Sequence, residues 1–309
     1  MVKKSLFAAL LWLALYHLLL PHLSHRFYEV NGLWRANHLR AQRYIYDVPA
    51  ETKVILGSSM SLSLNDEILG PGFFKLTLPG DSILTELEII RRAQKRPVVV
   101  LIETNGLGKD TNQEFVHDLF TPWLFKLRSW SAIFKEEGRP TNFVVGIVGA
   151  VVRKSSQWGL RMFAEKRPME TSVQTSTGHS TQFSTLLAMY QEQYNKPQPE
   201  QEIRSRADRI AKYVDMLTQQ GCKCIFFEMP IDSSLACLAE PMTVRKAMEM
   251  RFPKTRYHWL EFERNRSYQT VDGVHLLPAE ANYVTETVLR QTNQIINQTS
   301  PAKTTAAHN

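Results

Sequence analysis

The feature that most constrains the fold is a series of short apolar segments separated by amphipathic stretches. Five segments have the length and composition of buried strands: residues 53–57, 73–78, 97–103, 223–228 and 257–262. Apolar residues at helical spacing follow or separate them, at 83–94, 206–219 and 278–297. Because strands that alternate with helices form parallel sheets, we expect an α/β fold, a three-layer sandwich around a central parallel sheet of about five strands.

Two regions do not follow this alternation. Residues 111–199 form a long, irregular insertion in a domain predicted over 51–297. The insertion contains an uncharged apolar stretch, 143–152, that is too short to span a bilayer. A core helix and a patch resting on a membrane are both open interpretations of it. Its polar segment 171–183 is expected to be a loop, and the small, polar tail 298–309 is predicted to be disordered.

The first 25 residues predict where the chain resides. Lys3 and Lys4 precede an apolar run over residues 6–20, which approaches the length of a membrane-spanning helix if it extends to Leu23. The positive flank predicts a cytoplasmic N-terminus and an exported main domain, in the periplasm or outside the cell. No small-x-small cleavage pattern follows, which favours an uncleaved signal anchor over a cleaved signal peptide. A buried helix is the third alternative, and residues 26–50 are expected to be a connector.

Composition excludes several classes of protein. Hydrophobic residues make up 43% of the 309 residues, which argues against a polytopic membrane protein and a wholly disordered chain. The 37 Lys and Arg exceed the 30 Asp and Glu, which gives +7. Without a basic stripe and interleaved aromatics this surplus argues against nucleic-acid binding, whereas an anionic membrane face or an acidic polymer is compatible with it. Three cysteines are too few for a four-ligand zinc site, and neither a metal nor a cofactor is expected.

Polar residues with catalytic potential follow the predicted strands. Ser59 lies in a tight turn after the first strand, where a hydroxyl and its own N–H suit a nucleophile and an oxyanion donor. After the second and third strands, Gly80 offers an N–H and Asn105 offers a side-chain amide. Near the C-terminus, Asp272 stands three residues before His275, a spacing that lets a carboxylate orient an imidazole base.

Each of these residues also has an ordinary structural interpretation. Taken by itself, a serine in this turn fits a helix N-cap better than a nucleophile. Gly80 fits a simple turn, and Asn105 with Gly106 is a common turn pair. With nine Asp and nine His in the chain, an Asp-x-x-His match arises by chance roughly one time in four. Together these residues are stronger evidence for an active site than each is alone, because the ends of parallel strands meet at one edge of a sheet.

The order Ser, Gly, Asn and Asp-x-x-His resembles the SGNH (GDSL-like) hydrolase superfamily. The resemblance covers residues 55–110 and 222–296 and implies an SGNH/flavodoxin-like sandwich. It implies the following roles: Ser59 as nucleophile, the Ser59 N–H, the Gly80 N–H and Asn105 as oxyanion donors, and Asp272 with His275 as the acid–base pair.

The chain departs from the family pattern at two positions. The first motif is Gly-Ser-Ser instead of Gly-Asp-Ser, so Ser58 is an alternative nucleophile, although the alignment favours Ser59. Glu103 stands where the family usually has Gly in its Gly-x-Asn motif. A glutamate there is expected to narrow the oxyanion pocket or to repel an anionic substrate.

The anchor and the Gly-Ser-Ser motif together resemble a narrower group, the membrane-anchored proteins of alginate O-acetylation and of D-alanyl transfer to teichoic acid. This resemblance implies an O-acetyltransferase or acetylesterase that acts on a cell-envelope or extracellular polysaccharide. It also implies a membrane-bound O-acyltransferase as a partner. The alternative is a catalytically inactive scaffold of the same shape that binds polysaccharide or organises a secretion or acylation complex.

Overall fold

The computed structural model describes residues 2–19, 32–138, 177–196, 198–263 and 266–298. The chain divides into two compact units. Unit 1 comprises Met1–Asp47 and Glu114–Thr175, and unit 2 comprises Val48–Gln113 and Ser176–Asn309. The apolar stretch 143–152, the residues 171–176 and nearly all of the polar tail lie outside the described residues.

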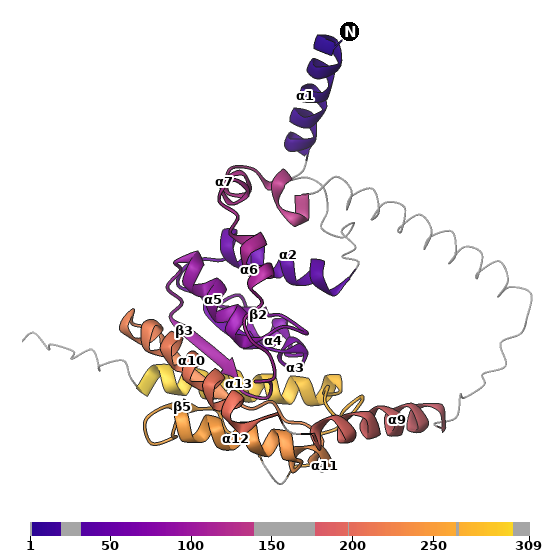
Figure 1. Cartoon of the computed structure of the whole chain (residues 1–309), viewed down its shortest axis with the longest axis vertical. Coiled ribbons are helices and arrows are strands. Elements are labelled where there is room, and N and C mark those ends of the chain that lie inside the picture. The colour runs from indigo at the N-terminus through magenta and orange to yellow at the C-terminus, as the bar shows by residue number, and fades with distance from the viewer. Residues whose placement is uncertain (1, 20–31, 139–176, 197, 264–265, 299–309) are drawn as a thin grey trace, which may run out of the picture. The chain divides into compact units, whose positions relative to one another are not determined.

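Unit 2 contains a five-stranded parallel sheet, which confirms the predicted α/β class (Figure 1). The strand order is β2-β1-β3-β4-β5, so β1 lies between the strands that follow it in the chain. The strands are β1 (Lys53–Gly57), β2 (Phe73–Thr77), β3 (Val99–Glu103), β4 (Lys223–Phe227) and β5 (His258–Trp259). Since all pairs are parallel, the carboxyl ends of the strands share one edge.

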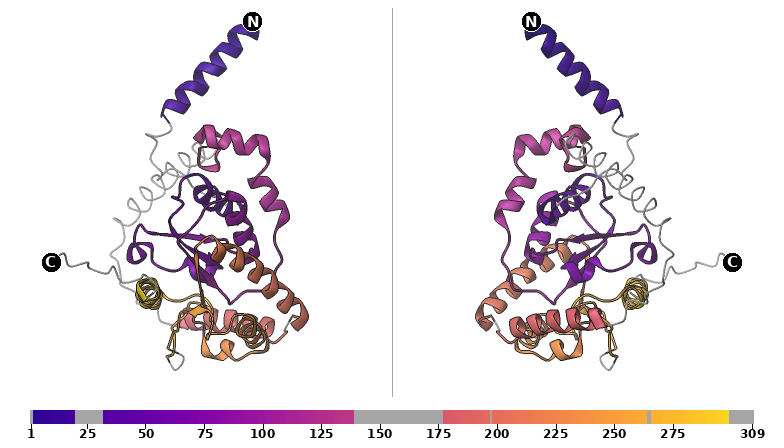
Figure 2. Two further views of the ribbon diagram at one scale, coloured as in Figure 1. Left: turned by 90° about the vertical axis from the view of Figure 1, so that its left-hand side faces the viewer. Right: turned by 90° about the vertical axis from the view of Figure 1, so that its right-hand side faces the viewer.

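Helices pack against both faces of this sheet, an arrangement compatible with a three-layer sandwich (Figure 2). One face carries a core that includes Ile55, Leu101 and Phe227 together with side chains from α13. Helices α5 and α10 pack on each other and on the sheet, and none of their buried side chains belongs to that core. They therefore cover the opposite face.

The helices of unit 2 are α3 (Ser59–Leu62), α4 (Asp66–Leu69), α5 (Ile83–Ala93), α9 (Thr177–Tyr194), α10 (Glu200–Gln219), α11 (Ser233–Ala236), α12 (Ala239–Arg251) and α13 (Pro278–Gln298). The predicted polar loop is wrong from residue 177 onward, because α9 begins there. Leu187, Tyr190 and Tyr194 of this helix pack on the core at helical spacing.

The fifth strand is much shorter than the predicted 257–262. Leu260 still donates its N–H to the Phe226 carbonyl of β4 at 2.8 Å. The next residue, Glu261, instead bonds the Gln291 side chain of α13 through both its N–H and its carbonyl. A helix side chain therefore replaces the neighbouring strand as the partner of the backbone, and the strand ends.

Unit 1 is helical over its described residues. Its elements are α1 (Val2–Leu19), α2 (Leu33–Tyr46), α6 (Gln113–Leu119), α7 (Pro122–Trp130), and the short 3₁₀ turns η3 (Ala132–Phe134) and η4 (Glu136–Gly138). Within the described part of the chain, α1 included, no helix has both the length and the apolar character needed to cross a membrane. Most of the predicted connector is helix α2.

Glu88 joins the two helices that cover one face of the sheet. Its carboxylate accepts hydrogen bonds from Arg91 and Arg92 of α5 and from the Tyr213 hydroxyl of α10. Burial raises the pKa of Glu88, but these hydrogen bonds outweigh it and lower the pKa from 4.5 to about 2. Because the folded-state pKa is lowered, the stabilisation is present above pH 4.5 and is lost as the pH falls toward 2.

We therefore expect Glu88→Gln to lower the melting temperature at pH 7, and the difference from the parent to shrink steadily below pH 4.5. Thermal unfolding followed by circular dichroism between pH 7 and pH 2.5 measures this. Glu67→Gln is the control, since that side chain lies exposed at the start of α4. A difference that is constant with pH would contradict the assigned role of the Glu88 charge.

Candidate active site

The first part of the site is the turn that follows β1. The strand ends at Gly57, and α3 begins two residues later at Ser59. Ser58 is the N-cap of this helix, because its Oγ accepts a hydrogen bond from the Met60 N–H at 3.1 Å. A helix cap is thus present in the turn, but Ser58 forms it. The Ser59 hydroxyl is left available for another partner.

That partner is His275. The Ser59 Oγ lies 2.8 Å from the His275 Nε2, and the His275 Nδ1 lies 2.7 Å from the Asp272 Oδ2. The three side chains form one continuous chain of hydrogen bonds across 216 residues of sequence. All three residues are half-buried. This arrangement is the geometry of a serine nucleophile with its base and orienting acid.

Backbone groups hold the acidic member in place. The Asp272 Oδ1 accepts the Val274 N–H at 2.9 Å and the His275 N–H at 2.8 Å. Burial raises the pKa of Asp272, but the hydrogen bonds from His275 and Val274 outweigh it and hold the pKa below its ordinary value. Asp272 is therefore ionised at neutral pH and can only accept. The proton of a neutral His275 must then sit on Nδ1, which leaves Nε2 to accept from Ser59.

One hydrogen bond and the backbone of Gly273 position the loop that carries Asp272 and His275. The Gly273 carbonyl accepts the Asp232 N–H at 2.8 Å, which ties the loop to the segment after β4. Gly273 has a φ of 97°, which L side chains rarely adopt. A Cβ built there would lie 2.7 Å from the Leu187 Cδ1 of α9. The loop is therefore fixed by its own backbone and by a helix from the predicted insertion.

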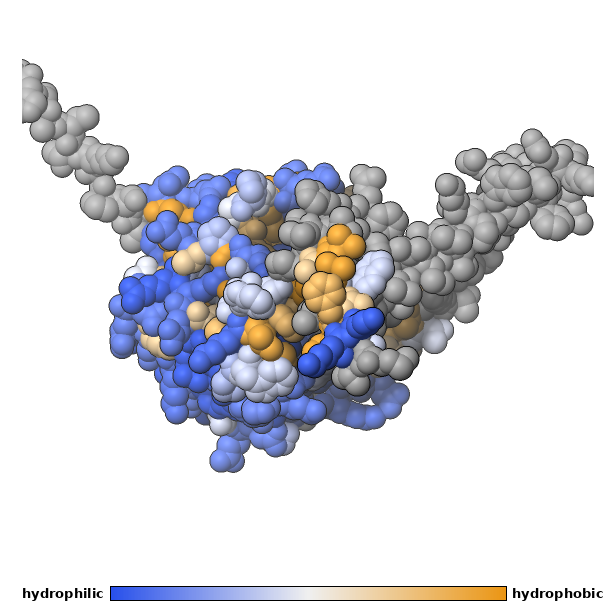
Figure 3. Space-filling model, turned by 90° about the horizontal axis from the view of Figure 1, so that it is seen from above, coloured by the Kyte–Doolittle hydropathy of each residue, from blue (hydrophilic) through white to orange (hydrophobic). Residues whose placement is uncertain are grey.

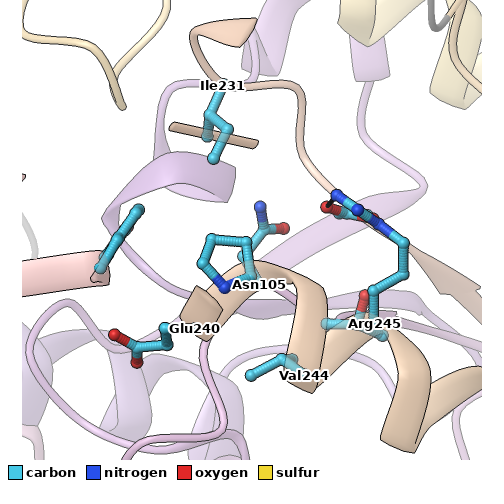
Figure 4. A pocket seen from close by; sticks show the side chains of 9 residues that line it. Asn105, Ile231, Glu240, Val244 and Arg245 are labelled. Atoms are coloured by element: carbon cyan, nitrogen blue, oxygen red, sulfur yellow. Dashed lines mark hydrogen bonds and ion pairs between the residues drawn. The ribbon is translucent and has the colours of Figure 1, made fainter. Parts of the chain in front are cut away.

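The two other predicted oxyanion residues have no hydrogen bond to Ser59 or His275 among the described residues. Gly80 has a φ of 77° in the turn after β2, and its carbonyl accepts from Lys109 at 2.6 Å. Asn105 bonds the backbone of Met229 with both groups of its amide, donating at 2.9 Å and accepting at 2.6 Å. Figure 4 shows Asn105 in a small pocket lined also by Ile231, Glu240 and Arg245.

The position of the Glu103 side chain differs most from what the sequence predicted. It is completely buried at the end of β3, and its carboxylate accepts from Ser58 and Ser61. Ser58 donates through its N–H at 3.0 Å and its hydroxyl at 2.7 Å. Ser61 donates through its N–H at 3.2 Å and through its hydroxyl. The two departures from the SGNH pattern, Ser58 and Glu103, therefore contact each other, and the carboxylate fixes the turn that presents Ser59.

A second buried carboxylate supports the same turn from the other side. Glu86 of α5 accepts the Gly57 N–H at 2.7 Å and the Leu78 N–H at 2.7 Å, so it joins the ends of β1 and β2. Burial raises the pKa of Glu86 well above its ordinary value, and the nearby Glu103 charge adds to this. Burial likewise raises the pKa of Glu103. Both carboxylates are buried at a considerable desolvation cost, and both bond residues of the turn that carries Ser59.

Neither the role of Glu86 nor that of helix α9 was predicted from the sequence. Glu86 lies among the buried, mostly apolar positions of α5. An acidic residue at such a position is the one sequence signal that could have indicated its role in holding the turn. Tyr190 and Tyr194 of α9 have raised pKa values, mainly through burial and in part through the nearby Asp272 charge.

Among the described residues, no group of three His, Cys, Asp or Glu side chains could hold a metal ion.

Compared with known proteins, the sequence matches no protein-family model and no curated protein.

The turn before Ser59 leaves no room for a side chain at Gly57. A Cβ there would meet the Glu103 carboxylate, the Ser61 Oγ at 2.7 Å and the Glu103 Cβ at 2.8 Å. We expect Gly57→Ala to lower the free energy of unfolding by about 1–3 kcal/mol through overpacking, measured by urea denaturation. In Gly72→Ala, the control, the new Cβ meets nothing within 4 Å. Equal stability of the two variants would contradict the close packing of this turn.

Proposed function

We propose that this chain is an SGNH-type serine enzyme that transfers an acyl group to, or removes one from, a cell-envelope or extracellular polysaccharide. The observation that carries the proposal is the hydrogen-bond chain from the Ser59 Oγ through the His275 ring to Asp272. Neither a helix cap nor a chance Asp-x-x-His pair would bring the Ser59 Oγ within 2.8 Å of the His275 Nε2, because the two residues are 216 positions apart in the sequence. The proposal includes the finer description of the fold as a three-layer, flavodoxin-like sandwich.

The proposed reaction has two half-reactions. The Ser59 Oγ attacks the carbonyl carbon of an acetyl or similar ester, and the His275 Nε2 takes the hydroxyl proton. The bond to the leaving alcohol breaks, and His275 returns the proton to that oxygen. A sugar hydroxyl or water then gives its proton to His275 and attacks the acyl-enzyme, which restores the Ser59 hydroxyl. Asp272 stays ionised throughout and stabilises the imidazolium.

Backbone donors near the nucleophile support an oxyanion site. The Ser59 N–H and the Gly80 N–H have no acceptor among the described residues. They follow β1 and β2, which pair in register from Lys53 with Phe73 to Gly57 with Thr77. Asn105 keeps one amide hydrogen beyond the one it donates to Met229. These three donors are the proposed stabilisers of the charge that develops on the carbonyl oxygen.

The proposal includes the location and the partners. Lys3 and Lys4 in the first turn of α1, ahead of its apolar residues, support a single-pass inner-membrane anchor over residues 1–25, with the main domain in the periplasm or outside the cell. A membrane-bound O-acyltransferase is the proposed source of the acyl group. Neither a cofactor nor a metal takes part in the proposed mechanism.

The second candidate is a non-catalytic scaffold that binds polysaccharide or organises a secretion or acylation complex. One observation favours it: both polar groups of the Asn105 amide are already bound to Met229. In such a protein the Ser59–His275–Asp272 chain would be a structural hydrogen-bond network. Activity measurements on Ser59 variants separate the two functions.

The first measurement is turnover of p-nitrophenyl acetate by the full chain in mild detergent. We expect Ser59→Ala to reduce kcat/KM by roughly 10³-fold or more, because the nucleophile is lost. Ser63→Ala is the matched control, since Ser63 lies on the same short segment and its hydroxyl only bonds the Met60 carbonyl. Circular dichroism shows whether each variant is folded. Equal turnover by the parent and a folded Ser59→Ala variant would favour the scaffold.

The second measurement separates acyl transfer from hydrolysis. The full chain is incubated with p-nitrophenyl acetate as donor and an alginate or chitin oligosaccharide as acceptor, and products are examined by mass spectrometry. We expect an acetylated sugar, 42 Da heavier than the acceptor, that is absent with Ser59→Ala. Release of acetate alone from both oligosaccharide mixtures would identify an esterase under these conditions and contradict transfer to these two glycans.

A further inference from the structure

Exposed apolar side chains are distributed unevenly between the two units. Among the described residues, nine of the fourteen exposed large apolar side chains belong to unit 1. They include every exposed tryptophan in the described part of the chain: Trp12, Trp34, Trp123 and Trp130. Apolar side chains are visible on the face drawn in Figure 3. Large exposed aromatic rings that lie together on one face are candidates for contact with another molecule.

Helix α7 presents the clearest part of this surface. Trp123 is 64% exposed and Trp130 is 80% exposed, and the exposed Lys126 lies between them. Their spacing of three, four and seven residues places the three side chains on one face of the helix. We call this set, Trp123, Lys126 and Trp130, the α7 outer face.

The other side of α7 is fixed within unit 1. The Arg128 guanidinium donates to the Asp118 carbonyl at 2.9 Å and to the Leu119 carbonyl at 3.2 Å. The Phe125 ring stacks on Phe120 at 5.7 Å and contacts the Tyr46 ring of α2 at 5.6 Å. The helix is thus held so that its two tryptophans point away from unit 1.

Two other tryptophans of the chain, Trp34 and Trp259, have internal partners. The Trp34 ring lies 5.0 Å from Phe115 and 5.0 Å from His38. The Trp259 Nε1 donates to the Phe252 carbonyl at 2.8 Å, and its ring packs on Phe226. Neither Trp123 nor Trp130 has a ring contact or a hydrogen bond to its indole N–H within the described residues. Packing within the described part of the chain therefore does not account for these two rings.

Charge distinguishes the units in the same way. Unit 1 contains 15 Lys and Arg against 8 Asp and Glu, whereas unit 2 contains 22 of each. The entire +7 of the chain is therefore a property of the unit that exposes the tryptophans. Lys126 has no ion pair in the part of the chain that the structure describes. A lysine without an ion pair between two exposed indole rings fits an anionic, partly apolar partner.

We propose that the α7 outer face lies in the headgroup region of an anionic lipid bilayer. Tryptophan is enriched at that depth, because its ring is apolar while its N–H finds polar partners among the headgroups. Lysine beside it is attracted to phosphatidylglycerol and similar lipids. The apolar helix α1 belongs to the same unit. A neutral glycan would match the rings but would leave the charge asymmetry without a role.

This proposal does not depend on the catalytic one. It assigns unit 1 to the lipid surface, whatever reaction or binding unit 2 performs. It also differs from an anchor over residues 1–25, because α7 contacts lipid headgroups without entering the hydrocarbon region.

The test measures how lipids brominated at the headgroup end of their acyl chains quench tryptophan fluorescence. Full-length protein is reconstituted into vesicles of brominated phosphatidylglycerol, with non-brominated vesicles as the reference. We expect Trp123→Phe/Trp130→Phe to lose at least half of the emission that bromine quenches in the parent. Phenylalanine keeps the face apolar, so the double variant removes the signal without removing the proposed contact. Trp12 is present in the parent and the variant and contributes the same amount to both.

Trp259→Phe in unit 2 is the matched control, and we expect the quenched emission to be unchanged. If the double variant and the parent lose equal emission, only other tryptophans reach the lipid and the proposal is wrong. It is also wrong if bromine quenches no emission of the parent, or if an oligosaccharide shifts the Trp123 and Trp130 emission while vesicles do not. Vesicles of brominated phosphatidylcholine should quench Trp123 and Trp130 at least twofold less, and equal quenching would overturn the role of lipid charge.

Discussion

The hydrogen bond between the Ser59 Oγ and the His275 Nε2 is the interaction on which the functional account depends. It joins the end of the first strand to a loop that lies just before the last helix. A parallel sheet makes such a contact possible, because it gathers the ends of all its strands at one edge. Contacts between α13 and the segment after α3 reinforce it. The Asn65 N–H donates to the Thr285 hydroxyl, and the Asn65 amide donates to Asn282.

The nucleophile turn is held by two buried carboxylates. Glu86 satisfies the backbone N–H groups of Gly57 and Leu78, and Glu103 satisfies those of Ser58 and Ser61. Burying two acidic groups side by side is costly, as their raised pKa values indicate. A network of this kind is retained where a precise backbone arrangement matters more than local stability. Here the arrangement fixed is the one that presents Ser59.

Much of the fold could be predicted from the sequence, because buried parallel strands are short apolar runs and their helices are amphipathic. The first strand, 53–57, has the predicted bounds. The fifth was overestimated, since nothing local to residues 260–262 shows that Gln291 replaces the strand partner. Helix α9 was also hidden, because its polar sequence has a weak helical pattern, and among its described side chains only Leu187, Tyr190 and Tyr194 pack on the core.

Part of the candidate site could also be predicted from the sequence. Ser59, Asp272 and His275 were expected to meet, because each follows a strand or precedes the last helix, and their side chains do form one hydrogen-bond chain. The direction of the Glu103 side chain could not be predicted. Its place in the motif suggested an obstacle in the oxyanion pocket, whereas its carboxylate faces Ser58 and Ser61. The direction of a side chain at a strand end depends on hydrogen-bond donors from other parts of the fold, and the spacing of residues in the sequence does not reveal them.

Reaction of the full chain with a fluorophosphonate, followed by mass spectrometry of its peptides, tests the central claim most directly. A serine activated by a histidine reacts with such a reagent, whereas an ordinary surface serine does not. The account predicts one phosphonylated residue, Ser59, and no adduct when His275 is replaced by Ala. An adduct on Ser58, an adduct that persists in His275→Ala, or an unmodified protein would contradict it.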